Sequence, residues 1–217
     1  MSTRLIALPA AEVNAWLDPA IHTYVTAMRY PRGTEHTRVD LWRNHLTRSG
    51  WTAVAALTTV SATELFRPGL SRLRLDTEWA HDREILVGVA YGYTGAADQW
   101  WNRQLRRGLA GRGYPTPQVD AITSDYFELT ELHVHPYAQG RGLGEALLTT
   151  LVAGRPEARI LLSTPEVHGE RNRAWSLYRR MGFVDVLRHY TFVGDPRPFA
   201  FLGRNLPLGG PGPASPE

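Results

Sequence analysis

Cysteine is absent from this chain of 217 residues. Disulfide bonds, cysteine nucleophiles and thiolate metal sites are therefore excluded. Lysine is absent too, because all 24 basic side chains are arginine, and a Walker-type phosphate loop needs a lysine. No apolar run approaches the roughly 20 residues that cross a bilayer, and the first residues lack the basic and apolar segments of a secretory signal. We therefore expect a cytoplasmic protein that does not enter a membrane.

Charge of either sign is modest. The formal net charge of +3 suits an anionic ligand, but no basic stripe indicates binding to nucleic acid. Hydrophobic residues make up 43% and charged residues 21%, as in an ordinary globular protein. The length provides one good core and is short for two domains. We predict a single domain over residues 1–206 and a disordered tail, rich in glycine and proline, over residues 207–217.

Periodicity along the chain predicts alternating helices and strands. A strand at 3–8 precedes helical stretches that Asp18-Pro19 interrupts, and residues 61–82 are polar and irregular. The remaining predicted strands are 52–60, 85–94, 127–134, 159–163, 183–193 and 198–203, and the remaining predicted helices are 34–48, 96–109, 142–153 and 170–181. This order predicts a mixed α/β (α+β) fold with a mixed sheet and helices on its faces.

The most informative segment joins the strand that ends at Val134 to the helix after it. Pro136 blocks further pairing, and the sequence Gln-Gly-Arg-Gly-Leu-Gly over 139–144 leads directly into the helix. Glycine allows close approach of a ligand, a helix start offers unpaired amides and partial positive charge, and Arg141 adds a charge-assisted donor. Together these features predict a pyrophosphate site. The alternative is a glycine-rich turn that only connects strand to helix.

Two motifs resemble those of the Gcn5-related N-acetyltransferase (GNAT) family. The pattern Gln139-x-x-Gly142-x-Gly144, preceded by Val134-His135-Pro136, is similar to Q/R-x-x-G-x-G/A with its leading V-x-P. About thirty residues later, the family pattern A-x-x-L-Y-x-x-x-G-F is matched by Ala174, Leu177, Tyr178, Gly182 and Phe183. The resemblance implies a single GNAT-like domain, with a central, mostly antiparallel sheet that is splayed at the cofactor strand and flanked by helices.

The resemblance also implies acetyl-CoA as cosubstrate and direct transfer of its acetyl group to an amine, which is either a small molecule or part of a protein. The backbone of His133 and Val134 would pair with the pantetheine arm. The pyrophosphate would be held by the amides of the loop, which are those of Gln139, Gly140, Arg141, Gly142, Leu143, Gly144 and Glu145. The family often has Asn three residues before Ala174. Here Arg171 stands at that position, and Asn172 beside it is the candidate cofactor residue.

Tyr178 is the candidate general acid. Acyl transfer from a thioester releases a thiolate, and a phenol with a pKa of about 10 keeps a proton for it at neutral pH. The alternative is a core tyrosine bonded to a backbone carbonyl.

An ammonium acceptor must lose a proton before it attacks, and some relatives use a strand glutamate for this step. The matching position here is Glu128, whereas a bulge in the strand would favour Glu131. Both carboxylates could instead be solvated, or paired with arginine.

His133 and His135 alternate on the predicted strand, so a metal site is conceivable there. A third ligand is not evident in the sequence. We therefore expect no metal, and we expect His133 to act through its backbone.

The long connection 95–125 carries Trp100, Trp101 and three arginines. It indicates a helix packed on the sheet or, alternatively, an aromatic and cationic wall for the acceptor or a homodimer contact. The alternative function for the whole chain is a non-catalytic module that senses acyl-CoA. Such a module would keep the phosphate loop and lose the chemistry.

Overall fold

The computed structural model describes residues 2–208 of the chain. These residues form the strands β1 (Thr3–Ala7), β2 (Thr52–Thr59), β3 (Glu84–Thr94), β4 (Tyr126–Val134), β5 (Arg159–Pro165), β6 (Val184–Thr191) and β7 (Pro198–Asn205). They also form the helices α1 (Val13–Met28), α2 (Thr34–His45), α3 (Trp100–Gly111), α4 (Thr116–Thr123), α5 (Leu143–Leu151) and α6 (Arg173–Arg180). Within residues 2–208, no helix has both the length and the apolar character to span a membrane. Most of the predicted disordered tail, 209–217, lies outside the described residues, and the domain boundary at 206 stays a prediction.

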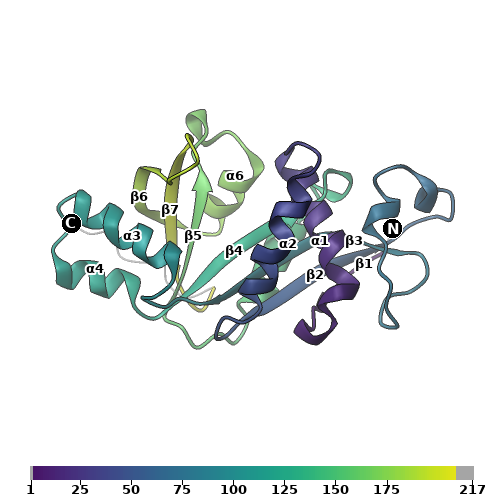
Figure 1. The fold of residues 1–217 in the computed structure, drawn as a ribbon, viewed down its shortest axis with the longest axis horizontal. Helices are drawn as coiled ribbons and strands as arrows, with labels where there is room; N and C mark the ends of the chain where they lie inside the picture. Colours follow the sequence, from purple (N-terminus) through teal and green to yellow (C-terminus); the bar gives the residue numbers. More distant parts are fainter. Residues whose placement is uncertain (1, 209–217) are drawn as a thin grey trace. The chain divides into compact units, whose positions relative to one another are not determined.

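The seven strands follow one another in the order β1-β2-β3-β4-β5-β7-β6 (Figure 1). The pairs β1–β2, β2–β3, β5–β7 and β6–β7 are antiparallel, and β4–β5 is parallel. The register of β4 with β5 covers Tyr126–Glu128 against Arg159–Leu161, and both strands continue beyond it. The predicted mixed fold with a mostly antiparallel sheet is confirmed, and the short register agrees with a sheet that splays at β4.

The chain divides into two compact units. Unit 1 comprises the residues up to Tyr93 together with Glu131–Leu151, and unit 2 comprises Thr94–Thr130 together with the residues from Val152 onward. Strand β4 therefore gives its first residues to unit 2 and its last residues to unit 1. The strands β1, β2 and β3 (except Thr94) and the helices α1, α2 and α5 belong to unit 1, while β5, β6, β7, α3, α4 and α6 belong to unit 2.

In unit 1, α1 and α2 lie over one face of β2 and β3 (Figure 1). Alternate residues of β2, namely Ala53, Ala55 and Leu57, belong to the core under these helices. This alternation is the period of two that a strand with one face in a core requires.

Helix α1 continues through Pro19, so the predicted interruption at Asp18-Pro19 is wrong. Proline costs a helix one backbone hydrogen bond and crowds the preceding turn. The side chains of Trp16, Leu17 and Ile21 around it are almost completely buried. Because tertiary packing supplies most helix stability in proteins, this burial outweighs the local defect.

The other face of the unit 1 sheet packs against α5. A Cβ built on Gly88 of β3 would come within 2.9 Å of the Leu147 Cδ1 atom and within 3.3 Å of the Ala56 Cβ atom. Leu147 is fully buried. The register of β2 with β3 also shifts between Ala56 and Leu57, beside this contact. The missing side chain at Gly88 therefore allows α5 to approach the strand closely.

In unit 2, the two tryptophans at the start of α3 have different environments. Trp101 is buried, and its indole N–H donates to the hydroxyl of Ser163 on β5 at 3.0 Å. Trp100 is 51% exposed and stacks on Phe192 with ring centroids 5.3 Å apart. Trp101 thus packs on the sheet, as the simpler interpretation of this segment predicts.

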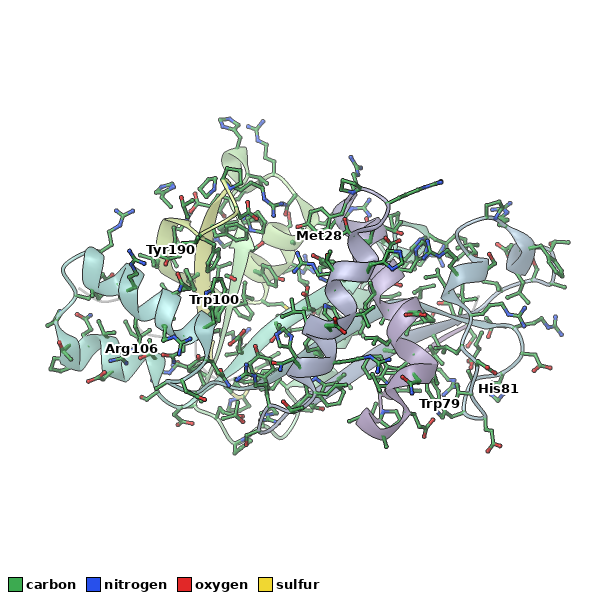
Figure 2. All side chains as sticks on the ribbon, in the orientation of Figure 1. Met28, Trp79, His81, Trp100, Arg106 and Tyr190 are labelled. Carbon is green, nitrogen blue, oxygen red and sulfur yellow. The ribbon has the colours of Figure 1, made fainter. Side chains whose placement is uncertain are left out.

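The sequence predicted one helix, 96–109, within the connection 95–125, and α4 is a second helix there. Pro117 occupies the first turn of α4, where its missing N–H costs no intrahelical bond. Arg106 of α3 lies between the two helices (Figure 2) and donates to the hydroxyl of Thr123 at 2.6 Å and to the carboxylate of Asp120. The inserted segment is therefore a pair of linked helices rather than one helix and a loop.

Arginines and carboxylates hold α6 in unit 2. The guanidinium carbons of Arg179 and Arg188 lie 5.0 and 4.9 Å from the ring of Trp175, which is fully buried. Arg179 donates to Glu170 at 2.7 Å, and Arg188 Nε donates to Glu166 at 2.9 Å. The network anchors α6 through both its packing and its charges.

Candidate active site

The loop predicted to hold pyrophosphate has the backbone of an anion cradle. Gly140 and Gly142 have φ angles of +79° and +76°, in the left-handed region that favours glycine. A Cβ built on either residue would meet nothing within 4 Å. Helix α5 begins at Leu143, and the Ala146 N–H donates to the Gly142 carbonyl at 3.1 Å. The amides of Leu143 and Gly144 precede that donor, at the positive end of the helix.

Two hydrogen bonds hold the end of β4, one to strand β3 and one from the loop that follows. The His135 N–H donates to the Val87 carbonyl of β3 at 2.8 Å. The side-chain amide of Gln139 donates back to the Val134 carbonyl at 2.8 Å. Gln139 thus closes the turn between β4 and the loop with its side chain, in addition to the backbone role predicted for it.

Tyr137 connects the loop to the segment after β2. The Arg141 guanidinium carbon lies 5.7 Å from the centre of the Tyr137 ring, and the Tyr137 hydroxyl donates to Glu64 at 2.8 Å. Hydrogen bonds from the Ser61 amide, the Ser61 hydroxyl and Tyr137 lower the pKa of Glu64 to about 2. Glu64 is therefore ionised at neutral pH and a firm acceptor for Tyr137.

The side chains of Glu131 and His133 contact each other on β4. Nε2 of His133 lies 2.5 Å from Oε2 of Glu131, and the spacing of two residues puts both side chains on one face of the strand. Their side chains are 15% and 11% exposed, respectively. The side chain of His133 is therefore engaged, whereas the sequence predicted only a backbone role for it.

Aromatic side chains from α1, α2 and β3 surround this pair. The rings of His133 and Tyr24 meet edge-on with centroids 4.8 Å apart. Tyr24 lies 5.9 Å from Trp42, which lies 4.8 Å from Tyr91, and all three are buried. Burial, together with the nearby Glu131 carboxylate, raises the pKa of Tyr24. Its phenol therefore stays protonated at neutral pH.

His45 of α2 belongs to the same cluster. Its Nδ1 lies 2.9 Å from the Tyr91 hydroxyl, and burial lowers the pKa of His45 to about 4. It is neutral at neutral pH. Nothing in the sequence singles out Tyr24, Trp42 or His45, because their convergence depends on how α1 and α2 pack.

Glu128, the first candidate for the general base, belongs to the unit 2 part of β4. It is 2% exposed, and burial followed by the charge of Glu128 raises the pKa of Tyr126 two residues before it. Glu131 belongs to the unit 1 part. Of the two candidates, Glu131 is the more exposed and is the one that an imidazole contacts at 2.5 Å.

Asn172 and Tyr178 lie at the start and in the body of α6. The Asn172 side-chain oxygen caps the helix by accepting the Trp175 N–H at 2.9 Å. Tyr178 is 7% exposed, and its ring lies 5.5 Å from that of Phe183. The cap orients the helix that carries Tyr178, while the roles of both residues toward the cofactor stay predictions.

His135 is engaged with its own turn. Its Nδ1 accepts the Tyr137 N–H at 3.3 Å, and its ring lies 6.3 Å from that of His22. Burial lowers the pKa of His135 to about 4. Across residues 2–208, no group of three or more His, Cys, Asp or Glu side chains is arranged to hold a metal ion.

The phosphate loop and the helices α5 and α6 lie within a segment that matches a known protein family. A family model described as an acetyltransferase (GNAT) domain matches residues 108–185. The GCN5-like protein acetyltransferase Rv2170 of Mycobacterium tuberculosis is 50% identical over 208 residues, which cover 96% of this chain and 100% of that protein.

Solved structures share the fold at low identity. Arabidopsis thaliana NAA60 in complex with a bisubstrate analogue is 17% identical, with a TM-score of 0.55 over 95% of this chain and 100% of that chain. PaiA N-acetyltransferase from Thermoplasma acidophilum in complex with coenzyme A is 12% identical, with a TM-score of 0.52 over 95% of this chain and 100% of that chain. Since half of the residues are identical to those of a GCN5-like acetyltransferase over almost the whole length, the chain belongs to the GNAT family of acetyltransferases.

Proposed function

We propose that this GNAT acetyltransferase uses acetyl-CoA to acetylate a primary amine carried by a protein. The mycobacterial relative is named a protein acetyltransferase, and the two chains align over the full length of that relative. A solved structure of the same fold is a complex with coenzyme A. The observation that carries the proposal is the geometry of the loop over residues 139–145.

The loop fits a diphosphate. Gly140 and Gly142 leave the space over their α carbons open, the start of α5 supplies amide donors, and Arg141 adds positive charge. The amides from Gln139 to Glu145 would hold the pyrophosphate. The backbone of His133 and Val134 would pair with the pantetheine arm, in the manner of a strand added to a sheet edge.

When bound, acetyl-CoA supplies an activated acyl group and a thiolate leaving group. The backbone N–H near Val134 would offer a hydrogen bond to the carbonyl on which charge develops. The Tyr178 hydroxyl would hold a proton for the leaving group, because a phenol has a higher ordinary pKa than a thiol. Asn172 would contribute by capping the helix that carries Tyr178.

The acceptor amine needs a group that removes its proton. An alkylammonium has an ordinary pKa of about 10.4, so nearly all of it is protonated at neutral pH. Glu128 and Glu131 stay the two carboxylate candidates. Glu131 is favoured, acting either directly or through the imidazole that it contacts, because it is more exposed than Glu128.

Calorimetry with coenzyme A and a thiol-release assay test the proposal together. We expect heat of binding, and thiol release with lysine-containing or N-terminal peptides. Gly142→Val should weaken coenzyme A binding by about tenfold or more, because a side chain with positive φ is strained by about 1–2 kcal/mol and projects into the cradle. Gly113→Val is the matched control, since Gly113 also has a positive φ and open space but lies between α3 and α4.

Each failure has a separate meaning. No heat with coenzyme A would contradict the phosphate loop. Heat without thiol release for any acceptor would favour the sensing module. Release with small amines and with no peptide would contradict a protein acceptor.

A further inference from the structure

We infer that His133, oriented by the carboxylate of Glu131, is the side chain that takes the proton from the acceptor amine. The inference rests on the proposed acetyl transfer and adds a side-chain role to a residue for which only a backbone role was predicted. It is carried by the contact between Glu131 and His133 on β4 and by the packing of Tyr24 against His133.

The contact with Glu131 decides which ring nitrogen of His133 is basic. A carboxylate can only accept hydrogen bonds, so Nε2, at 2.5 Å from Oε2 of Glu131, carries a proton and donates it. In a neutral imidazole the other nitrogen, Nδ1, then holds the lone pair. His133 is therefore arranged as a base, with the carboxylate opposite the basic nitrogen. The same division of roles operates when an aspartate orients the histidine of a serine hydrolase.

The surroundings of His133 hold the ring in place. Its side chain is 11% exposed, and the edge-on contact with Tyr24 at 4.8 Å restricts rotation of the imidazole. Tyr24 is itself packed against Trp42 at 5.9 Å. The base is thus held by α1 and α2 as well as by its own strand.

Few groups near His133 change their charge between pH 5 and 9. On α1, Tyr24 stays protonated because burial raises its pKa. On α2, His45 stays neutral because burial lowers its pKa to about 4, and the guanidinium carbon of Arg38, a permanent cation, lies 5.5 Å from the Tyr24 ring. On β3, Tyr91 contacts His45. The negative partner for an imidazolium at this position is therefore Glu131, on β4 itself.

Three other histidines of unit 1 have different surroundings. His45 and His135 each have Nδ1 in a hydrogen bond, the first with the Tyr91 hydroxyl and the second with the Tyr137 N–H. Burial lowers the pKa of both to about 4, which makes them poor bases for an ammonium. His22 lies 3.9 Å from Glu35, beyond hydrogen-bond distance.

The proton transfer balances without another reactant. An N–H bond of the acceptor ammonium breaks, an N–H bond forms at Nδ1 of His133, and the amine nitrogen recovers its lone pair for attack. The positive charge moves to the imidazole, where the Glu131 carboxylate stabilises it. The proton leaves to solvent when the imidazolium is reset.

Steady-state kinetics of His133→Asn test the inference in the full-length chain. We expect kcat at neutral pH to fall by about 10²–10⁴-fold, the usual contribution of general acid–base catalysis, while KM for acetyl-CoA changes less than about twofold. The deficit should shrink as the pH approaches about 10, because the acceptor amine then loses its proton without help. The acidic limb of the kcat/KM profile should disappear in the variant.

His189→Asn is the matched control, because His189 also pairs with a carboxylate, Glu166, at 2.8 Å in unit 2. Its kinetics should equal those of the wild type. His133→Gln provides a second variant if the first fails to fold. Nitrogen NMR of the wild-type imidazoles adds a readout that needs no turnover: we expect the Nε2–H tautomer for His133 and loss of that preference in Glu131→Gln.

The experiments distinguish failure of this inference from failure of the proposed function. A wild type that binds coenzyme A and releases thiol, with a His133→Asn variant equally active at neutral pH, overturns this inference alone, as does an Nδ1–H tautomer. A wild type that releases no thiol with any acceptor overturns the proposed function and this inference with it.

Discussion

Across residues 2–208, two carboxylate–histidine pairs lie within hydrogen-bond distance, one in each compact unit, and their surroundings differ. In unit 1, Glu131 and His133 are both mostly buried, at 15% and 11% exposure, beside buried aromatic rings. In unit 2, His189 pairs with Glu166 at 2.8 Å, but its imidazole is 67% exposed. Glu166 also accepts hydrogen bonds from Arg188 at 2.9 Å and from the His189 amide at 2.7 Å.

The two carboxylates differ in the side chain that balances their negative charge. Burial alone would raise the pKa of Glu166, but the hydrogen bonds from Arg188 and the His189 amide lower it instead. The permanent cation Arg188 therefore neutralises the negative charge of Glu166. Glu131 directs its contact to an imidazole that can gain and lose a proton. Glu166, which Arg188 neutralises, stabilises the fold. Glu131 contacts only a histidine among the pairs described, so its charge can orient that imidazole and stabilise its protonated form.

Glu131→Gln and Glu166→Gln should separate the two pairs most strongly. The first change keeps the shape of the side chain and removes the charge that stabilises an imidazolium, so we expect kcat/KM to fall about 100-fold. The second should leave kcat/KM unchanged. Thiol release at low acceptor concentration measures both, and Glu131→Asp should recover part of the loss. Equal losses in the two glutamine variants would contradict the contrast.

Stability should show the reverse order. Arg188→Met keeps the stem over Trp175 and leaves Glu166, 9% exposed at its side chain, without its guanidinium partner. We expect a loss of about 2–3 kcal/mol in the free energy of unfolding, as for a charged group deprived of its hydrogen bond. His133→Asn should cost less, because Glu131 loses one imidazole donor rather than a guanidinium. Urea unfolding of the two variants measures the difference, and a larger loss for His133→Asn would break the comparison.

The free energy of unfolding should depend on pH over one range through the buried histidines His45 and His135 of unit 1, and over a lower range through Glu170 of unit 2. His45 and His135 have folded pKa values of about 4, so the unfolded chain binds their protons first. Their contribution to stability is complete above about pH 6.5 and falls as the pH drops toward about 4, by an amount on the order of 1 kcal/mol for each histidine. The Arg179 hydrogen bond lowers the pKa of Glu170, whose contribution is present above its unfolded pKa and is lost as the pH falls through the folded one.

Urea unfolding as a function of pH separates these contributions. His135→Gln should flatten the pH dependence between about 6.5 and 4, and Glu170→Gln should flatten it only below about 4.5. A His135→Gln variant with the full wild-type slope in the upper range would contradict the assignment of that range to buried histidines.

The smallest effect is expected at the exposed member of the two pairs. His189→Asn removes an imidazole that is 67% exposed, and surface ion pairs of this kind contribute little. Thermal and urea unfolding should agree within about 0.5 kcal/mol of the wild type. A loss above 1 kcal/mol would mean that the Glu166–His189 pair contributes more than its exposure implies.

Local pattern predicted the elements that frame the site. The strand expected over 127–134 is β4 at Tyr126–Val134, and the helix expected over 142–153 is α5 at Leu143–Leu151. Apolar, β-branched runs bounded by Pro and Gly leave few alternatives at these places. The loop glycines were also predictable, because Gly140 and Gly142 adopt φ values that few other residues tolerate.

What the sequence could not supply depends on packing between distant segments. The continuity of α1 through Pro19 follows from the burial of its neighbours, which no local rule contains. The convergence of Tyr24, Trp42 and His133 joins three elements far apart in the chain. The alternation of Glu131 and His133 on one strand was visible, but alternation alone does not show that the two side chains meet.

The glycine at position 88 of β3 has a consequence for the phosphate loop, although it contributes no ligand. Because its hydrogen stands where any other residue would press on Leu147, position 88 sets how deeply α5 can settle onto the strand. The loop leads directly into that same helix. The absence of a side chain at position 88 thus determines how close to the sheet the phosphate loop lies.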